Sequence, residues 1–359
     1  MIQLKDLCQK ASSNIAQKDL EGHEGQYPIY GASGLIGYVD FYKQENPYVA
    51  VVKDGAGIGR VMCLPEKSSV IGTMQYILPN EGVNVHYLAF AMEHMNLAKY
   101  FSGATIPHIY FKDYGKEKLL ERTEKEQKSI AEILSKMDSL ISLRKQQLAK
   151  LDELVKARFV EMFGDPVSNP LNWPTAELGK RCEIITGNTP SRAEPENYGT
   201  FIEWIKSDNI NTPSTFLTEA QERLSEIGFQ KCRFVESGSL LMTCIAGSLN
   251  CIGNVAVVNR RVAFNQQINA ITPTHDNVLY LYWLMILSKP TIHRTINMAL
   301  KGILSKSQLS SIKFPFPPLP LQNQFAAFVE RVDQQKQTVQ QSLEKLELMK
   351  KALMQEYFG

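Results

Sequence analysis

The sequence predicts an α+β protein in which two related α/β globules alternate with two long helices that form an antiparallel coiled coil. Three observations predict this class. Residues 127–164 recur without a gap as residues 322–359, both copies have the apolar spacing of long helices, and the segments before them share a looser β-rich pattern. We therefore expect a first globule at 1–115, a first helical segment at 116–164, a second globule at 165–316 and a second helical segment at 317–359.

The composition indicates a globular chain without a membrane partner. Of its 359 residues, 44% are hydrophobic and 21% are charged. The longest apolar run, 278–287, is about half the roughly 20 residues that a bilayer span needs, and the first residues lack a signal-peptide core. We expect a cytoplasmic protein. Its net charge is +2, and the four segments carry −2, +2, +2 and 0, so bulk charge alone would not hold it on a nucleic acid.

No catalytic or metal site is predicted. The six cysteines show no C-x-x-C spacing, and we expect reduced structural thiols, with a Cys244–Cys251 pair as the alternative in an oxidising compartment. His86 and His94 are eight residues apart and His108 stands alone, without an H-E-x-x-H motif or a carboxylate cluster.

The two repeated segments are expected to be helices at 121–162 and 321–357, each roughly 60 Å long. Their apolar residues recur in steps of three and four, the spacing of a coiled-coil seam. These positions are 130, 133, 137, 140, 148, 151, 154/155 and 162 in the first, and 325, 328, 332, 339, 343, 346, 349, 353 and 357 in the second. Gly164-Asp165-Pro166 should end the first helix, and a Pro-rich stretch at 315–320 precedes the second.

Each seam is interrupted by polar residues, Arg144 and Gln147 in the first and Gln335 and Ser342 in the second. If the helices run antiparallel with their ends flush, the two interruptions meet and fix the register at some cost in stability. The alternative is that these residues only face solvent.

A glycine run at Gly55, Gly57 and Gly59 resembles the phosphate-binding loop of a nucleotide site, and the preceding Asn-Pro-Tyr at 46–48 is one proline short of a methyltransferase box. A cofactor loop must join a strand to a helix. Residues 51–79 align loosely with 241–273, which places Gly59 on Gly253 and 73–75 on 265–267, and a strand pattern follows the glycine in both copies. The run therefore predicts a turn between strands.

The order of globule, helix, globule and helix resembles the specificity subunit of type I restriction–modification systems over nearly the whole chain. The segments that carry the resemblance are 27–38, 105–134, 163–210 and 302–329. Two departures stand out. The first globule is shorter than the second, and the first junction lacks the prolines of the second, which predicts an earlier start for the first helix and a first domain that reads fewer bases.

The resemblance implies a non-enzymatic subunit whose two globules each read one half of a bipartite site in double-stranded DNA. The helix pair would set the spacing and dock two modification subunits. Those partners would bind S-adenosylmethionine and methylate adenine, so no cofactor is expected in this chain, and restriction subunits can join as motor and nuclease. The alternatives are a coiled-coil scaffold for protein partners that reads no DNA, and a stand-alone methyltransferase or nuclease.

Candidate DNA contacts are amide, hydroxyl and basic side chains in the loops of both globules, because Asn and Gln pair well with adenine, and Arg or Lys with guanine. For each of them the alternative is a turn former or an ordinary surface residue. The candidates are Lys53, Arg60, Gln75 and His108 in the first globule, and Lys206, Asn209, Ser248, Asn250, Gln266 and Gln267 in the second.

Overall fold

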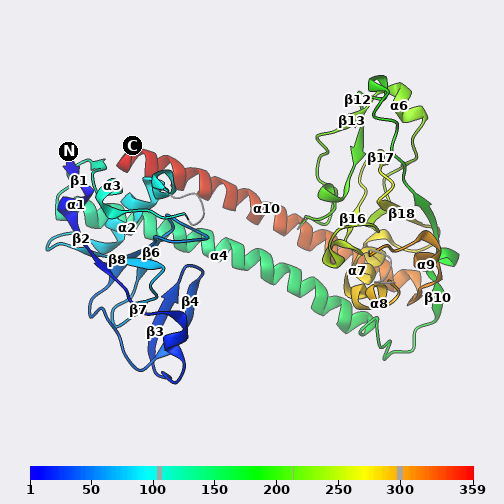
Figure 1. Cartoon of the computed structure of the whole chain (residues 1–359). Coiled ribbons are helices and arrows are strands. Elements are labelled where there is room, and N and C mark those ends of the chain that lie inside the picture. The colour runs from blue at the N-terminus through cyan, green and yellow to red at the C-terminus, as the bar shows by residue number, and fades with distance from the viewer. Residues whose placement is uncertain (103–106, 213, 297–301) are drawn as a thin grey trace. The chain divides into compact units, whose positions relative to one another are not determined.

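The computed structural model describes residues 1–102, 107–212, 214–296 and 302–359, and these form two compact units (Figure 1). The first unit comprises 1–147 and 339–359, and the second comprises 148–338. Two 40-residue helices, α4 (Glu124–Phe163) and α10 (Leu319–Phe358), each contribute one end to each unit. No helix within the described residues is long and apolar enough to cross a membrane.

The first unit is built around an antiparallel sheet with strand order β2-β8-β5-β6, and α2 packs on β5 and β6. A smaller sheet, β4-β3-β7, lies farther from the long helices in Figure 1, and β1 pairs with β9. The elements are β1 (Ile2–Gln3), α1 (Leu4–Leu7), β2 (Cys8–Ser12), η1 (Gln17–Leu20), β3 (Tyr27–Gly31), β4 (Gly34–Val39), β5 (Tyr48–Val52), β6 (Val61–Leu64), β7 (Ser69–Val70), β8 (Met74–Pro79), α2 (Val85–His94), η2 (Leu97–Tyr100), α3 (Phe111–Tyr114) and β9 (Lys118–Leu119).

The second unit repeats this plan with the antiparallel sheet β11-β18-β15-β16, the smaller sheet β13-β12-β17-β14 and the pair β10-β19. Its elements are β10 (Thr175–Glu177), α5 (Leu178–Arg181), β11 (Cys182–Thr186), η3 (Pro195–Asn197), β12 (Tyr198–Ile205), η4 (Ser207–Asn209), β13 (Arg223–Leu224), α6 (Glu226–Gln230), β14 (Phe234–Val235), β15 (Leu240–Thr243), η5 (Leu249–Cys251), β16 (Val255–Val257), β17 (Val262–Phe264), β18 (Ile268–Pro273), α7 (Val278–Leu287), α8 (Lys289–Arg294), α9 (Lys306–Ser311) and β19 (Lys313–Pro315).

Strand register shows the repeat directly and corrects part of the sequence alignment. Strand β2 pairs with β8 from Cys8 opposite Pro79 to Ser12 opposite Gln75. Strand β11 pairs with β18 in the same way, from a cysteine opposite Pro273 to Thr186 opposite Asn269. Gln75 therefore corresponds to Asn269 and not to Gln267, because the turns before β8 and β18, 71–73 and 265–267, are equally long and the offset set by Gly59 and Gly253 continues without a gap. The predicted fold class is confirmed.

The ends of the long helices follow local signals in the sequence. Thr123 and Glu126 form a reciprocal cap at the start of α4, since the Thr123 amide donates to the Glu126 carboxylate at 2.8 Å and the Glu126 amide donates to the Thr123 hydroxyl at 3.4 Å. Gly164 ends the helix with φ of +76°, and its amide bonds the carbonyl of Val160. The predicted early start of the first helix is wrong, because both helices begin three residues before their repeated glutamines, Gln127 and Gln322.

The two helices run antiparallel within each unit. In the first unit, Lys350 bonds Asp138 at 2.8 Å and Lys145 lies 2.9 Å from Glu347. In the second unit, Lys336 bonds Asp152 at 2.7 Å. Partner numbers fall along one helix as they rise along the other, as antiparallel pairing requires.

Each unit uses its helix ends as part of its own core, which extends the buried face of each helix beyond the predicted seam. In the second unit, Phe159 of α4 stacks on Tyr280 of α7 at 5.5 Å between ring centroids and packs edge-on against Phe325 of α10. In the first unit, Phe358 of α10 packs against Tyr87 of α2. The helices thus face a globule as well as each other. Most predicted seam positions are buried or half-buried, with Val155 the buried residue of the 154/155 position, whereas Ile133, Leu140 and Met349 are exposed.

The repeated glutamines tie each helix start to its own globule. The side-chain oxygen of Gln127 accepts the backbone N–H of Asn84 at 3.0 Å, and Gln322 accepts that of Asn277 at 2.9 Å. Asn84 and Asn277 are themselves the N-caps of α2 and α7. The two glutamines are 5% and 0% exposed.

All six cysteines are free. Cys8 and Cys182 occupy equivalent buried positions, and burial raises the pKa of both thiols to about 12. Burial likewise raises the pKa of Cys244 to about 12, so these three are thiols and not thiolates at neutral pH.

Candidate nucleic-acid interface

Four of the six predicted contacts of the second unit lie on loops that meet at one end of its main sheet. Strand β11 ends at this edge where β18 begins, with Thr186 opposite Asn269. Strand β15 ends and β16 begins at the same edge. The segments 187–192, 244–254 and 265–267 therefore emerge together, and we call them the loop end of the second unit. Ser248, Asn250, Gln266 and Gln267 all belong to it.

The first unit has an equivalent loop end. Strand β2 ends opposite the start of β8, and the β5–β6 connection at 53–60 leaves from the same edge. Lys53 and Arg60 lie on that connection. His108 joins them because the N–H of residue 109 bonds the carbonyl of Lys53 at 3.0 Å. Both units thus gather polar loops at the same edge of the same sheet.

The segment 187–192 connects the loop end of the second unit to the smaller sheet. Thr189 hydrogen-bonds the side chain of Gln266, and Asn188 donates to the carbonyl of Lys231 at 2.8 Å. Trp204 of β12 donates to the carbonyl of Asn188 at 3.4 Å. Gln266 is exposed next to this anchored segment, so its amide is available at the surface.

Lys206 and Asn209 lie where β12 ends and line a polar cavity of about 470 Å³. Lys206 pairs with Glu222 at 2.9 Å, and Arg192 reaches the other oxygen of the same carboxylate at 2.8 Å. Burial opposes ionisation of Glu222, but Lys206 and Arg192 outweigh it and hold the pKa of the carboxyl below its usual value. Asn209 is only 8% exposed, because it caps the 206–209 turn and bonds the carbonyl of Glu219.

Ser248 and Asn250 are exposed on the β15–β16 connection, which is hydrogen-bonded to α8. Lys289 of α8 donates to the carbonyl of Asn250 and to the side chain of Asn254. Burial lowers the pKa of Lys289. Gln267 is half-buried at the neighbouring turn, where its carbonyl accepts the N–H groups of residues 244 and 245.

In the first unit, a small charged cluster holds the glycine-rich connection. His108 contacts Asp54 through its Nδ1, and Lys53 lies 3.7 Å from the same carboxylate. Arg60 is exposed and donates to the carbonyl of Ala32 in the β3–β4 turn at 2.6 Å. Lys53, Arg60 and His108 are therefore brought together around one connection.

Gln75 is placed differently from the other candidates of the first unit. It is 5% exposed and accepts a hydrogen bond from the hydroxyl of Tyr114 at 3.1 Å. Its counterpart Asn269 is 2% exposed and is bonded by Thr186. The side chains of Gln75 and Asn269 thus bond groups inside their own unit. Gln75 is therefore left out of the proposed contact surface, and so is Asn209, which is buried and bonded to the carbonyl of Glu219.

The glycine run is a connection between the antiparallel strands β5 and β6, as the sequence predicts. Gly55, Gly57 and Gly59 all have positive φ, between +79° and +85°. At Gly59 a Cβ atom would lie 2.4 Å from the backbone nitrogen of Ala98, so only glycine fits there. Gly253 has φ of +82° at the corresponding place between β15 and β16. The glycines allow the backbone to make this connection, and Gly59 allows it to pass close to Ala98 in η2.

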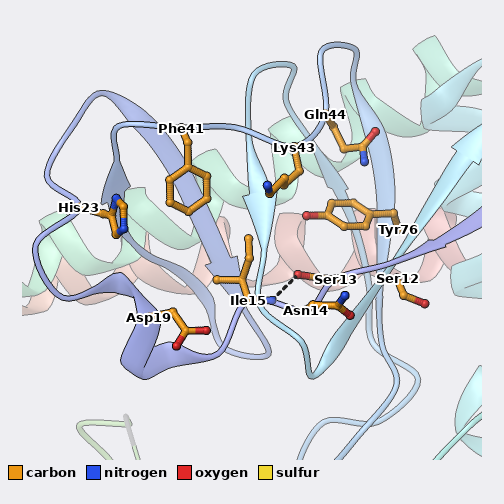
Figure 2. A pocket seen from close by; sticks show the side chains of 10 residues that line it. All are labelled: Ser12, Ser13, Asn14, Ile15, Asp19, His23, Phe41, Lys43, Gln44 and Tyr76. Atoms are coloured by element: carbon orange, nitrogen blue, oxygen red, sulfur yellow. Dashed lines mark hydrogen bonds between the residues drawn. The ribbon is translucent and has the colours of Figure 1, made fainter.

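A cavity of about 550 Å³ opens beside the loop end of the first unit (Figure 2). In Figure 2 the ring of Phe41 stands between His23 and Lys43, with Ser13 and Asp19 on the opposite rim. The His23 and Phe41 rings are 5.3 Å apart in an edge contact, and the Lys43 ammonium lies 5.6 Å from the Phe41 ring centre. The cavity offers donors, acceptors and an aromatic face together.

The four residues proposed to set helix register stay a prediction. Arg144 and Ser342 are half-buried in the first unit, and Gln147 and Gln335 are exposed. Arg144 donates to Gln147 on its own helix at 2.8 Å.

Sequence reasoning missed Arg192, Lys43 and Phe41. Arg192 follows the Gly-Asn-Thr-Pro-Ser stretch at 187–191, and that turn-rich composition next to a basic residue was the available signal. For Lys43 and Phe41 no spacing marks the site, because residues from four separate segments meet there only in three dimensions. Within the described residues, no group of three or more His, Cys, Asp or Glu side chains is arranged to hold a metal ion.

Both units consist of a main antiparallel sheet, a smaller sheet and one end of each long helix, with polar loops at the same edge of the main sheet, which is a duplicated α+β fold. The sequence matches the profile described as "Type I restriction modification DNA specificity domain" over residues 1–153 and 170–348. The chain belongs to this family, the specificity subunits of type I restriction–modification systems.

Two curated relatives agree with this assignment. The chain is 23% identical to the putative type I restriction enzyme MjaX specificity subunit of Methanocaldococcus jannaschii, with 98% of this chain and 91% of the relative covered. It is 27% identical to the HindI specificity subunit of Haemophilus influenzae over 50% of this chain, and spans only 39% of that relative.

Solved structures show the same fold. The type I restriction–modification S subunit from M. genitalium aligns over 100% of this chain and 95% of its own, with a TM-score of 0.65 at 16% identity. A chain from a structure titled for complex assembly and conformational transition of the type I system aligns over 99% and 96%, with a TM-score of 0.55 at 14% identity.

Proposed function

We propose that this chain selects the DNA sequence on which a type I complex acts. Each unit reads one half of a bipartite site in double-stranded DNA through its loop end. The helix pair α4 and α10 sets the gap between the halves and docks two modification subunits. This chain supplies recognition, while those partners bind S-adenosylmethionine and methylate adenine, and restriction subunits can join them.

The observation that carries the proposal is the equivalence of the two loop ends. Loops from separate strands meet at the same edge of the same sheet in both units. The first loop end gathers the basic and imidazole side chains of Lys53, Arg60 and His108, and the second gathers the exposed amides of Asn250 and Gln266 together with Arg192. Side chains of these types read base edges in the major groove. A duplicated reader suits a site of two halves, because each globule can contact its own stretch of DNA.

The low net charge of the chain favours a DNA-binding surface that is shared with the partner subunits. The chain carries a net charge of only +2, and several cations near the second loop end are already paired, as Lys206 and Arg192 are with Glu222. Phosphate neutralisation dominates the affinity of DNA-binding proteins. The partner subunits would therefore supply much of the phosphate contact, and this chain would add selectivity.

The test is to co-express the chain with the adenine-methylating subunits of its system and to sequence the methylated sites. The proposal predicts one bipartite motif. Exchanging residues 1–119 for those of a relative should change one half of that motif and leave the other half intact. A complex that assembles but binds all sequences equally would support the scaffold alternative, and a change in both halves would contradict independent reading.

A further inference from the structure

Arg192 stands on an aromatic platform at the surface of the second unit. Its guanidinium carbon lies 5.0 Å from the ring centre of Tyr198 and 5.6 Å from that of Trp204. One nitrogen lies 2.8 Å from Glu222, yet the Arg192 side chain is 61% exposed. Among the residues that the structure describes, its other N–H groups have no hydrogen-bond partner. These N–H groups belong to a largely exposed side chain and are free to donate to a ligand.

The platform is tied to the segment that carries the arginine. Tyr198 donates through its hydroxyl to the carbonyl of Pro190 at 3.0 Å, and Trp204 donates to the carbonyl of Asn188. Asn197 donates to the carbonyl of Ser191 at 3.0 Å. The rings, the backbone and the carboxylate together restrain a side chain that would otherwise sample many rotamers, so little entropy remains to be lost on binding.

We infer that Arg192 determines specificity by donating two hydrogen bonds to the O6 and N7 atoms of a guanine in the half-site that the second unit reads. The inference rests on the proposed function and adds to it the base and the residue that reads it. An arginine fork matches this pair of acceptors, which no other base offers in the major groove.

The carboxylate of Glu222 favours a base over a phosphate as the partner of Arg192. A phosphate bound by the same guanidinium would be repelled by the carboxylate on its other side, whereas the guanine edge carries no net charge. Glu222 acts as a positioning residue, because it fixes the plane of the fork without touching DNA. Lys206 donates to the other oxygen of this carboxylate at 2.9 Å and so helps to hold Glu222 in place.

Arg261 provides a matched control. It pairs with Glu236 at 2.6 Å, stacks 5.5 Å from the ring centre of Phe234, and is 57% exposed. It precedes β17, however, whereas Gln266 of the loop end follows that strand. Arg261 thus has the same chemistry at the other end of the strand.

The experiment uses the complete complex with its modification subunits. Affinity is measured at one fixed salt concentration for duplexes that differ from the methylated motif by a single base pair. The variants are R192K, which keeps the charge and loses the fork, E222Q and R261K. We expect R192K to lose roughly tenfold or more of the discrimination at one G·C pair of the second half-site. E222Q should lose less at the same pair, and R261K none.

Three outcomes would overturn the inference. One is a second half-site without any G·C pair, and another is unchanged discrimination in R192K. The third is a uniform loss of affinity over all duplexes with selectivity retained, which identifies a phosphate contact. Failure of the proposed function looks different, because the wild-type complex would then show no sequence preference at all.

Discussion

Replacing Gln322 with methionine tests how the repeat builds each unit. The Gln322 side chain is fully buried and makes three hydrogen bonds, from the N–H of Asn277 at 2.9 Å, to the carbonyl of Pro317 at 2.8 Å and to Asp276 at 2.8 Å. Methionine keeps the shape but leaves these groups without their partner. An unpaired buried polar group costs about 1–3 kcal/mol. Because Asp276 remains held by Arg181, we expect a loss of about 3 kcal/mol in the free energy of unfolding.

The equivalent change in the first unit should cost less. Gln127 makes two hydrogen bonds, with Asn84 and with the carbonyl of Arg122, each at 3.0 Å, and Val83 stands where the second unit has Asp276. We expect about 2 kcal/mol for Q127M. Gln324, exposed on the same turn as Gln322, provides the control variant Q324M.

The assay is denaturant unfolding combined with hydrogen exchange. Q322M should accelerate exchange in 278–287, and Q127M in 85–94, because each glutamine anchors only its own unit. The reasoning is refuted if Q322M costs no more than Q324M, or if it loosens α2 instead of α7.

Further outcomes follow from named contacts. G59A should lower the melting temperature more than G57A, because a Cβ at 59 meets backbone at 2.4 Å whereas one at 57 meets only the Arg60 side chain at 3.4 Å. Truncating Arg260, which binds the 10%-exposed carboxylate of Glu203 through two bonds of 2.7 Å, should cost about 3–5 kcal/mol, and R261A should leave stability unchanged. The hydrogen bonds from Arg260 lower the pKa of the Glu203 carboxyl. The stabilisation from this pair is therefore complete above the pKa of an unfolded glutamate, about 4.3, and is lost as pH falls through the lower pKa of the folded state. In acid titration, R260M should lose less of its free energy of unfolding over this range than the wild type.

The large-scale organisation could be predicted because it depends on periodic patterns. A gapless repeat, long helices with a glycine end, and strand patterns on both sides of a glycine run are properties of local sequence. The buried stripe could not be predicted as closely. Leu140 and Met349 fit a two-helix seam, but they are exposed, because the globules compete with the partner helix for the buried faces.

The candidate site could be predicted only in part, because exposure is a tertiary property. Gln75 and Asn209 have the right chemistry for base contacts, yet each is buried and satisfied by a neighbour. Arg192 shows the converse. Its role depends on Trp204 and Glu222, which lie 12 and 30 residues away in the sequence and meet it only in the folded unit.

The central claim is that two readers are held at a set spacing by the helix pair, and changing the helix length tests it most directly. Four residues are inserted into α4 after Gln147 and four into α10 after Thr338, the two points at which the chain divides into its units. At 1.5 Å per residue the insertion adds about 6 Å, or one to two base pairs at roughly 3.4 Å each. Alanine at Gln146 and Gln340, both exposed, is the control without added length.

The measurement is sequencing of the methylated sites of the lengthened complex. The account predicts that both half-site sequences stay the same while the gap between them grows by one or two base pairs, and that the alanine control keeps the original gap. Full methylation at the original gap in the lengthened complex would contradict the account, because the helices would then not set the spacing.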